Sequence, residues 1–168
     1  STRVLPLAYS FLSSAGLGAS VQPYLDELAR SIGETVSLAV LDDAEVVFVA
    51  RSDIPGRRLA YVVTTGMRLP AFSSASGRVL LAHRPRSIVA QLLARTKITR
   101  LTRHTLMSRR DITAMIDKAG RDGHSINHQE IEEDLLSASV PVPNRAGLVI
   151  AALNVSTSAS RSTEARMK

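Results

Sequence analysis

The sequence predicts one α+β domain with a mainly antiparallel sheet flanked by helices. Helical and strand patterns occur in separate runs, in the order helix, helix, strands, helices, strands, and this segregation favours α+β over a doubly wound fold. The length of 168 residues is typical of one domain that buries a sizeable core without a disulfide or a metal. The chain contains no cysteine, and 45% of its residues are hydrophobic, as in an ordinary globular protein.

Two helices are expected at the start of the chain. Apolar residues recur at helical spacing in residues 1–15, which have neither an initiator Met nor a cap, so we expect the end of a longer helix there. A second helix is expected over residues 20–32, with Pro23 in its first turn. The predicted breaks and caps are Gly16, Gly18, Ser20 and Gly33.

Strand patterns follow. Thr35–Leu41 and Glu45–Arg51 are β-branched runs separated by a turn, which indicates a hairpin. The segment from Val46 to Val49 is apolar on both faces, so we expect this strand to be covered on both sides. Further strands are expected at residues 59–64, in a short segment ending at Leu69, and at residues 124–127, 135–142 and 148–155.

Three more helices are expected between the strands. A compact helix over residues 75–82 begins after Ser74. The next helix has Pro85 at its first position and an apolar face made by Ile88, Val89, Leu92 and Leu93. After a polar loop over residues 96–106, Ser108 and Asp111 resemble a capping box, and this helix ends at Gly123.

The end of the chain is rich in Ser, Thr and Arg, so a flexible tail is expected from Thr157. The predicted organisation is therefore a helix end over residues 1–15, a domain over residues 16–156 and a tail over residues 157–168.

The net charge of +6 is concentrated in one stretch. Eight basic residues and no acid lie between Arg84 and Arg110, so the remainder of the chain sums to −2. One interpretation is a nucleic-acid surface that contacts phosphates. Against it, the stretch has no interleaved aromatic residues and no helix-turn-helix pattern. The alternative is a solvated helix and loop that pairs with the acidic run Glu130–Asp134.

Enzyme and membrane functions find no support in the residues. The sequence has no Cys nucleophile, no GxSxG, GxGxxG or HExxH motif and no P-loop. His124 and His128 lack a third metal ligand, and residues 130–134 are expected to form a solvated turn. No apolar run is long enough to span a membrane, and no signal peptide is visible, so we expect a cytoplasmic protein without metal or cofactor.

Polar residues within apolar elements indicate a possible binding site. Ser137 and Ser139 point to one face of their strand, as do Asn154 and Ser156. Ser73, Ser74 and Ser76 cluster at the start of the compact helix, where free N–H groups suit a small anion. These residues predict a small-molecule pocket. They are equally consistent with helix caps and ordinary outward-facing strand residues.

Several segments resemble IclR-type transcriptional regulators. Residues 66–82 resemble the family signature G-x-x-x-P-x-x-x-x-x-x-G-[KR]-x-x-L-A. Residues 123–133 resemble G-[YF]-x-x-x-x-x-E, residues 137–142 resemble S-I-A-A-P-V, and residues 148–155 match the closing strand. Within the family, the Ser-Ala-Ser-Gly-Arg-Val-Leu-Leu-Ala stretch most resembles regulators of aromatic-acid and β-ketoadipate catabolism.

This resemblance implies a particular architecture. In the family, an N-terminal winged helix-turn-helix binds DNA and a linker helix leads to an effector-binding domain with a GAF-like or profilin-like fold. The chain resembles that second domain with the end of the linker helix, and lacks the DNA-reading module. The resemblance further implies a homodimer or a dimer of dimers, with small organic or aromatic acids as effectors.

The resemblance also implies the pocket residues. Ser76 and the N–H groups at the helix start are expected to hold the carboxylate of the ligand, with Arg68 or His128 as possible charge partners. Asn127 stands where the family often has an acid, and Asn154 where it often has a serine; an amide imposes less charge preference. The implied ligand-binding positions are Tyr61, Leu69, Ala75, Ser76, Asn127, Ser137, Asn154 and Ser156.

Overall fold

The structure is a computed structural model that describes residues 17–56 and 63–167. The helix end predicted over residues 1–15 lies outside the described residues, as does most of the strand predicted over residues 59–64, including Tyr61. Val63 and Thr64, at the end of that predicted strand, are not in a strand.

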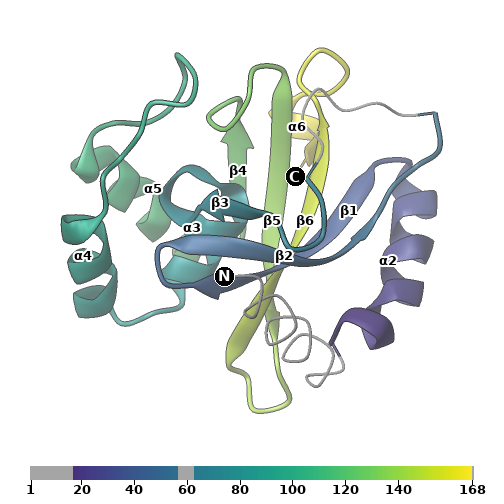
Figure 1. Cartoon of the computed structure of the whole chain (residues 1–168), viewed down its shortest axis with the longest axis horizontal. Helices are drawn as coiled ribbons and strands as arrows, with labels where there is room; N and C mark the ends of the chain where they lie inside the picture. Colours follow the sequence, from purple (N-terminus) through teal and green to yellow (C-terminus); the bar gives the residue numbers. More distant parts are fainter. Residues whose placement is uncertain (1–16, 57–62, 168) are drawn as a thin grey trace, which may run out of the picture.

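The described part of the chain folds around one six-stranded antiparallel sheet with the strand order β3-β2-β1-β6-β5-β4. The sheet is strongly twisted, so that β1 and β2 cross the direction of β5 and β6 (Figure 1). The predicted α+β fold with a mainly antiparallel sheet is confirmed. The strands are β1 Thr35–Asp42, β2 Glu45–Ser52, β3 Arg68–Pro70, β4 Ser125–His128, β5 Leu135–Pro143 and β6 Val149–Ser158.

Helices lie on both sides of the sheet (Figure 1). We call the side that contacts α3 the front face and the side that contacts α2 the back face. Helices α4 and α5 lie beyond α3 on the front side. The helical elements are α2 Leu17–Ile32, the 3₁₀ turn η1 Ala71–Ser73, α3 Ala75–Ala82, α4 Arg86–Arg95, α5 Arg109–Asp122 and α6 Glu164–Met167.

Two apolar cores sandwich the sheet. Val46 and Phe48 of β2 belong to the front core, together with side chains from α3, α4 and α5. Val49 and Ala50 of the same strand belong to the back core, beneath α2. The prediction that this strand is covered on both sides is therefore confirmed.

Helix α2 differs from its prediction at the N-terminal end. It already includes Leu17, so Gly18 does not break it, Ser20 does not cap it, and Pro23 is inside it. An interior proline removes one backbone hydrogen bond. Packing of Leu25 and Ala29 in the back core keeps the helix on the sheet despite that loss. At the other end, Gly33 has φ 69° and its N–H donates to the Ala29 carbonyl, as predicted.

The front helices follow their predicted caps closely. Ser74 caps α3 by accepting from the N–H of Gly77, and Ser108 caps α5 by accepting from the N–H of Asp111. Pro85 is the N-cap of α4 and not its first helical residue. Ile88 is 45% exposed, so the predicted apolar face of α4 is narrower than expected.

The last strand is longer than predicted. β6 continues to Ser158, and both Thr157 and Ser158 are buried, although the predicted tail begins at Thr157. Asp134 holds this end of the strand, because its carboxylate accepts from the Ser158 hydroxyl at 2.5 Å and from the Ser160 N–H at 2.7 Å. The Ser158 hydrogen bond is the main cause that lowers the pKa of Asp134 below its ordinary value.

A buried ion pair anchors α3. Arg78 of α3 is fully buried, and its guanidinium donates to both carboxylate oxygens of Glu130, at 2.6 and 2.7 Å. Its Nε donates to the Phe72 carbonyl at 3.2 Å. The Glu130 carboxylate also accepts from the N–H of Leu106. Four segments thus meet at one pair: η1, α3, the loop before α5 and the loop after β4.

This ion pair corrects one prediction. Residues 130–134 do form the expected turn, but Glu130 is only 7% exposed and is not part of a solvated surface. A carboxylate can be buried here because its partner is a rigid, bidentate donor. The two residues are 52 positions apart, so no local pattern connects them.

The backbones of α3 and η1 pack so closely at Gly77 that no side chain fits there. A Cβ atom at this position would lie 2.1 Å from the Ala71 carbonyl oxygen. We predict that Gly77→Ala lowers the free energy of unfolding by about 3 kcal/mol, because backbone must move to relieve the clash. Urea unfolding measures this change.

Gly120 in α5 is the matched control. A Cβ there would lie 3.5 Å from the Ala82 Cβ, an ordinary contact. Gly120→Ala should raise stability by about 0.5–1 kcal/mol through helix propensity. Equal effects of the two substitutions would contradict the close approach of α3 and η1.

A second prediction concerns the buried ion pair. Glu130→Ala should destabilise the chain by about 3–5 kcal/mol, because it leaves the Arg78 charge buried without its partner. The double variant Arg78→Met, Glu130→Leu should recover more than half of that loss, since it removes both charges. Thermal or urea unfolding of the three proteins gives the comparison.

The exposed pair Arg86–Asp117 serves as control, because the side chain of Arg86 is 87% exposed. Asp117→Ala should change stability by less than about 1 kcal/mol. If Glu130→Ala costs no more than Asp117→Ala, Arg78 and Glu130 do not anchor α3.

Candidate functional site

A row of polar side chains crosses the front face of the sheet. Ser37, Asn154, Ser139 and Ser125 are register partners on the neighbouring strands β1, β6, β5 and β4. We call these four residues the polar row. All four are at least 95% buried. A parallel row follows two residues along, with Ser156, Ser137 and Asn127 in register.

Hydrogen bonds join the polar row to the start of α3. The Ser76 and Ser139 hydroxyl oxygens are 2.9 Å apart, and Ser139 donates to the Asn154 Oδ1 at 2.8 Å. The Asn154 Nδ2 donates to the Ser156 hydroxyl at 2.9 Å and to the Ser37 hydroxyl at 3.4 Å. The predicted residues Ser76, Asn154 and Ser156 are therefore brought together.

The first turn of α3 supplies further donors. Ser74 satisfies the N–H groups of Gly77 and Arg78 through its hydroxyl and its carbonyl. Within the described residues, the N–H groups of Ala75 and Ser76 have no assigned acceptor. The positive end of the helix dipole lies at the same place. This arrangement is suited to an anion or a carbonyl oxygen.

Asn127 has a structural role beside this site. Its Nδ2 donates to the Ser73 carbonyl at 2.5 Å, and its Oδ1 accepts from the Glu130 N–H at 3.2 Å. An ionised acid could not donate to that carbonyl, which explains why an amide is suited to this chain. Asn127 is thus adjacent to the site while both ends of its amide are engaged.

The remaining predicted residues that the structure describes are buried. Leu69 and Ala75 are buried on the front side, and Ser137 is 8% exposed. Tyr61 lies outside the described residues.

The two possible charge partners do not join the site. Arg68 donates to Asp42 and Glu45, which raise its pKa, and strand alternation directs it to the face opposite Leu69. His128 is exposed, and its ring centroid lies 6.1 Å from that of His104. Both residues therefore have surface partners.

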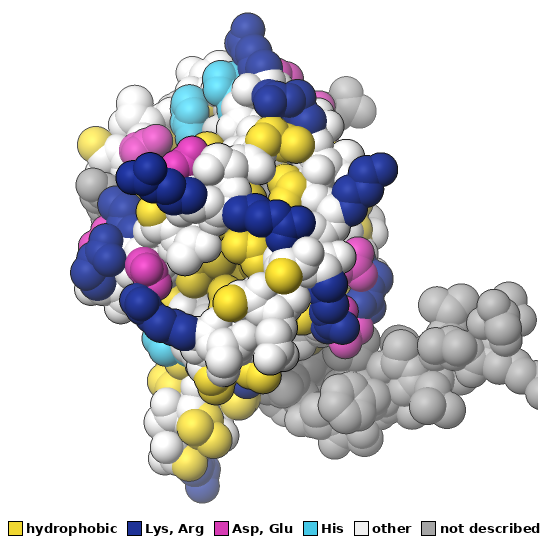
Figure 2. Space-filling model, turned by 90° about the vertical axis from the view of Figure 1, so that its left-hand side faces the viewer, with side chains coloured by type: hydrophobic (Ala, Val, Ile, Leu, Met, Phe, Trp, Pro, Cys, Tyr) yellow, Lys and Arg dark blue, Asp and Glu magenta, His cyan; other side chains and the backbone are white. Residues whose placement is uncertain are grey.

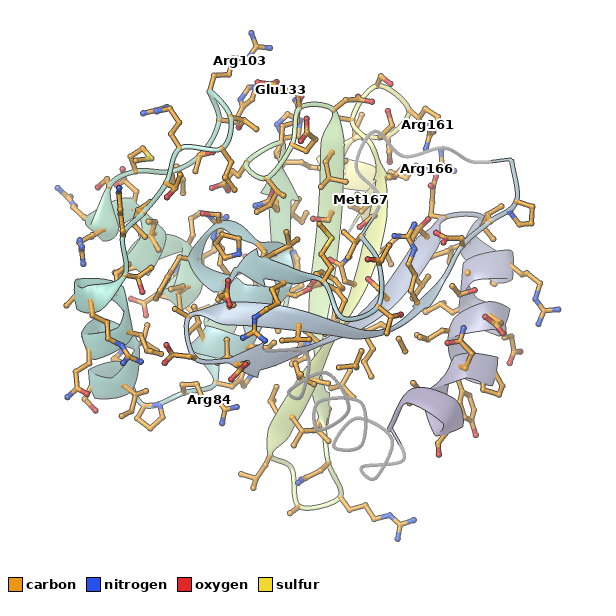
Figure 3. All side chains as sticks on the ribbon, in the orientation of Figure 1. Arg84, Arg103, Glu133, Arg161, Arg166 and Met167 are labelled. Carbon is orange, nitrogen blue, oxygen red and sulfur yellow. The ribbon has the colours of Figure 1, made fainter. Side chains whose placement is uncertain are left out.

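A hollow of about 490 Å³ lies on the back face, and Ser139 of the polar row is among the residues that line it. Its lining is mostly apolar, and Arg166 and Met167 of α6 lie beside β5 and β6 there (Figure 3). The other lining residues include Ile32, Ala138, Val140, Leu153 and Val155.

The basic stretch does not form one surface. Arg84 and Arg103 lie far apart, with Arg103 at the top of the view and Arg84 at its lower left (Figure 3). On the face over α4 and α5 the cations are interspersed with acids and apolar groups (Figure 2). Arg95 pairs with Asp43, and Arg103 lies 3.6 Å from Glu133. The surface thus gives no support to the nucleic-acid interpretation.

Residues 17–56 and 63–167 contain no group of three or more His, Asp or Glu side chains that could hold a metal ion. None of the helices described there is long and apolar enough to cross a bilayer.

Comparisons with known proteins connect this geometry to a family. The family model described as bacterial transcriptional regulator IclR C-terminal matches residues 9–168. The chain is 34% identical over 166 residues to the Pca regulon regulatory protein of Pseudomonas putida, covering 99% of this chain and 57% of that protein. The chain therefore spans little more than half of this relative, which is named as a regulator and not as an enzyme, in agreement with the prediction.

Solved structures show the same fold. One is the inducer-binding domain of a double mutant of the transcription factor PobR from Acinetobacter, in complex with 3-hydroxybenzoic acid. It has a TM-score of 0.81 and 30% identity, over 88% of this chain and 86% of that one. Another is an IclR homologue from Microbacterium hydrocarbonoxydans in complex with 4-hydroxybenzoate, with a TM-score of 0.78 and 26% identity, over 86% and 59% of the two chains.

These matches confirm the resemblance stated from the sequence motifs. Glu130 is the acidic residue of the motif that begins at Gly123, and Arg78 is the basic residue that follows Gly77, so two family motifs meet in the buried ion pair. The chain belongs to the IclR C-terminal family of bacterial transcriptional regulators.

Proposed function

We propose that this chain is the effector-binding domain of a transcriptional regulator, and that it binds a small aromatic or organic carboxylic acid on its front face. The observation that carries this proposal is the chain of hydrogen bonds from Ser76 through Ser139 to Asn154, beneath the first turn of α3. Hydroxyl, amide and backbone donors converge there, next to apolar surface.

The carboxylate is held at the start of α3. Its oxygens accept from the N–H groups of Ala75 and Ser76 and from the Ser76 hydroxyl, where the helix dipole favours negative charge. The aromatic or aliphatic body packs on the apolar front residues beside the row, which include Leu69, Ala39 and Ala152. Solved relatives that contain hydroxybenzoates support this class of effector.

Binding exchanges one set of hydrogen bonds for another. In the structure, the Ser76 and Ser139 hydroxyls bond to each other, so neither is left unsatisfied. An acid that replaces this hydrogen bond contacts both α3 and β5, and so changes how the two elements are positioned relative to each other. The effector therefore shifts the equilibrium between two conformations of the domain, which differ in the position of α3 relative to β5. The size of the shift is set by the difference between the affinities of the effector for the two conformations.

The complete regulator extends beyond this chain in our proposal. Relatives are longer than the matched region, and an N-terminal winged helix-turn-helix accounts for the additional length. Operator DNA is bound by that module, and the assembled protein is a homodimer or a dimer of dimers. Since its target is bacterial DNA, its location is the cytoplasm. Effector binding adjusts the spacing of the DNA-binding modules.

Titration calorimetry tests the acid site. The chain should bind 3- or 4-hydroxybenzoate with a dissociation constant on the order of 10–100 µM, as expected for ten non-hydrogen atoms that contribute about −0.6 kcal/mol each. Ser76→Ala should weaken this binding about tenfold, because one donor to the carboxylate is lost.

Ser87→Ala is the matched control, because Ser87 is exposed and is the second residue of α4, as Ser76 is of α3. The control should bind like the unmodified chain. If neither hydroxybenzoate nor succinate gives a heat of binding, the chain is not a sensor of such acids.

A further inference from the structure

A buried arginine continues the polar row at its β2 end. Arg51 is the register partner of Ser37, so the row extends across five strands as Arg51, Ser37, Asn154, Ser139 and Ser125. The side chain of Arg51 is only 10% exposed. It therefore places a cation at one end of a row whose other four members are uncharged.

A β-bulge turns this arginine to the front face. Val46 and Phe48 point to the front core, so strict alternation would direct Arg51 to the back. The register between β1 and β2 shifts between Leu38 and Ala39, and both Val49 and Ala50 face the back core. The extra residue in β2 reverses the alternation of its side chains between the two faces, so Arg51 lies on the front face beside Ser37. Bulges often re-aim side chains in this way next to functional sites.

The Arg51 guanidinium is hydrogen-bonded along one edge, and we call the edge that carries Nη1 its free edge. Its Nε donates to the carboxylate oxygens of Asp53 at 2.7 and 2.8 Å, and its Nη2 also bonds to Asp53. Asp53 is held in turn by the Thr35 hydroxyl at 3.0 Å. The Nη1 atom is buried and has no hydrogen-bond partner among residues 17–56 and 63–167. A buried, unsatisfied guanidinium nitrogen is costly, so it indicates a missing acceptor.

The spacing between Arg51 and Ser139 fits a ligand with polar groups at both ends. Their strands are three positions apart in the sheet, which separates their Cα atoms by about 14 Å. The outer oxygens of a benzoate with an oxygen substituent are about 7 Å apart, which is less than this separation. Groups at the two ends of the row can therefore contact opposite ends of one such molecule.

We propose that the free edge of Arg51 binds a second oxygen atom of the effector, at the end remote from α3. This inference rests on the proposed acid site, which places the carboxylate at Ser76. It assigns Arg51 as the residue that selects aromatic acids with a second oxygen function over simple monoacids. Asp53 orients the guanidinium and balances its charge, so the acceptor is either a neutral hydroxyl or a carboxylate.

Ligand pairs of equal shape test this selection without changing the protein. The 168-residue chain is titrated with 4-hydroxybenzoate, 4-methylbenzoate and terephthalate by calorimetry. The hydroxyl compound should bind at least about tenfold more tightly than the methyl compound, because only the hydroxyl oxygen accepts from a charged donor. Terephthalate distinguishes the acceptors: tighter binding than 4-hydroxybenzoate assigns a carboxylate, and weaker binding assigns a hydroxyl.

The variant Arg51→Met tests whether Arg51 is the residue that donates to the hydroxyl oxygen of the ligand. This variant should bind 4-hydroxybenzoate and 4-methylbenzoate with affinities within about twofold of each other, while its affinity for 4-methylbenzoate stays near that of the unmodified chain. Arg145→Met is the control, since Arg145 is exposed in the loop between β5 and β6. The control should keep the tenfold preference.

The outcomes separate the two proposals. If the unmodified chain binds the acids but does not prefer the hydroxyl compound, or if Arg51→Met keeps the preference, the role of Arg51 is wrong and the acid site stands. If the unmodified chain binds none of the acids, the acid site itself is wrong. The comparison of ligands on the unmodified chain decides the matter even if Arg51→Met does not fold.

Discussion

The bond between Arg78 and Glu130 connects the elements on which the candidate site depends. Arg78 lies in the first turns of α3, and Glu130 lies in the loop that leads from β4 to β5. Because the pair is bidentate and buried, it fixes both the position and the rotation of α3 over the sheet. Ser76, two residues earlier, is thereby held over Ser139, and the free N–H groups of the helix start face the polar row.

The two buried charges of this anchor are matched within the pair, while Ser37, Asn154, Ser139 and Ser125 are uncharged. Removing two charges from water is offset only by a complete set of partners, and the nearby loops supply these partners. Ser37, Asn154 and Ser139 of the polar row hydrogen-bond to one another through hydroxyl and amide groups, which can each donate and accept. Such a face tolerates an incoming acid better than one with fixed acceptors. The front face thus combines a rigid anchor with adaptable donors.

Local patterns predicted much of this structure. The Ser74 and Ser108 caps, the first hairpin and the alternation of Ser137 with Ser139 all depend on neighbours within a few residues, and each is visible in the sequence. The start of α2 was not predictable in this way, because packing on the sheet outweighs a glycine and a proline.

The least predictable features depend on contacts between distant segments. Glu130 looks like one acid among several in a turn, and only the fold shows that Arg78 reaches it. Arg51 looks like the end of an alternating strand, and only the register shift reveals its face. The sequence motifs did contain Gly77, Arg78 and Glu130, so the family resemblance marked the residues whose roles the pattern could not explain.

Binding of acids at the front face, under the start of α3, can be mapped by NMR chemical shifts with 4-hydroxybenzoate. We expect the largest shifts at the backbone amides of Ala75, Ser76 and Ser139 and at the side-chain amide of Asn154. Shifts confined to the back-face hollow, at residues such as Leu153 and Arg166, would contradict it.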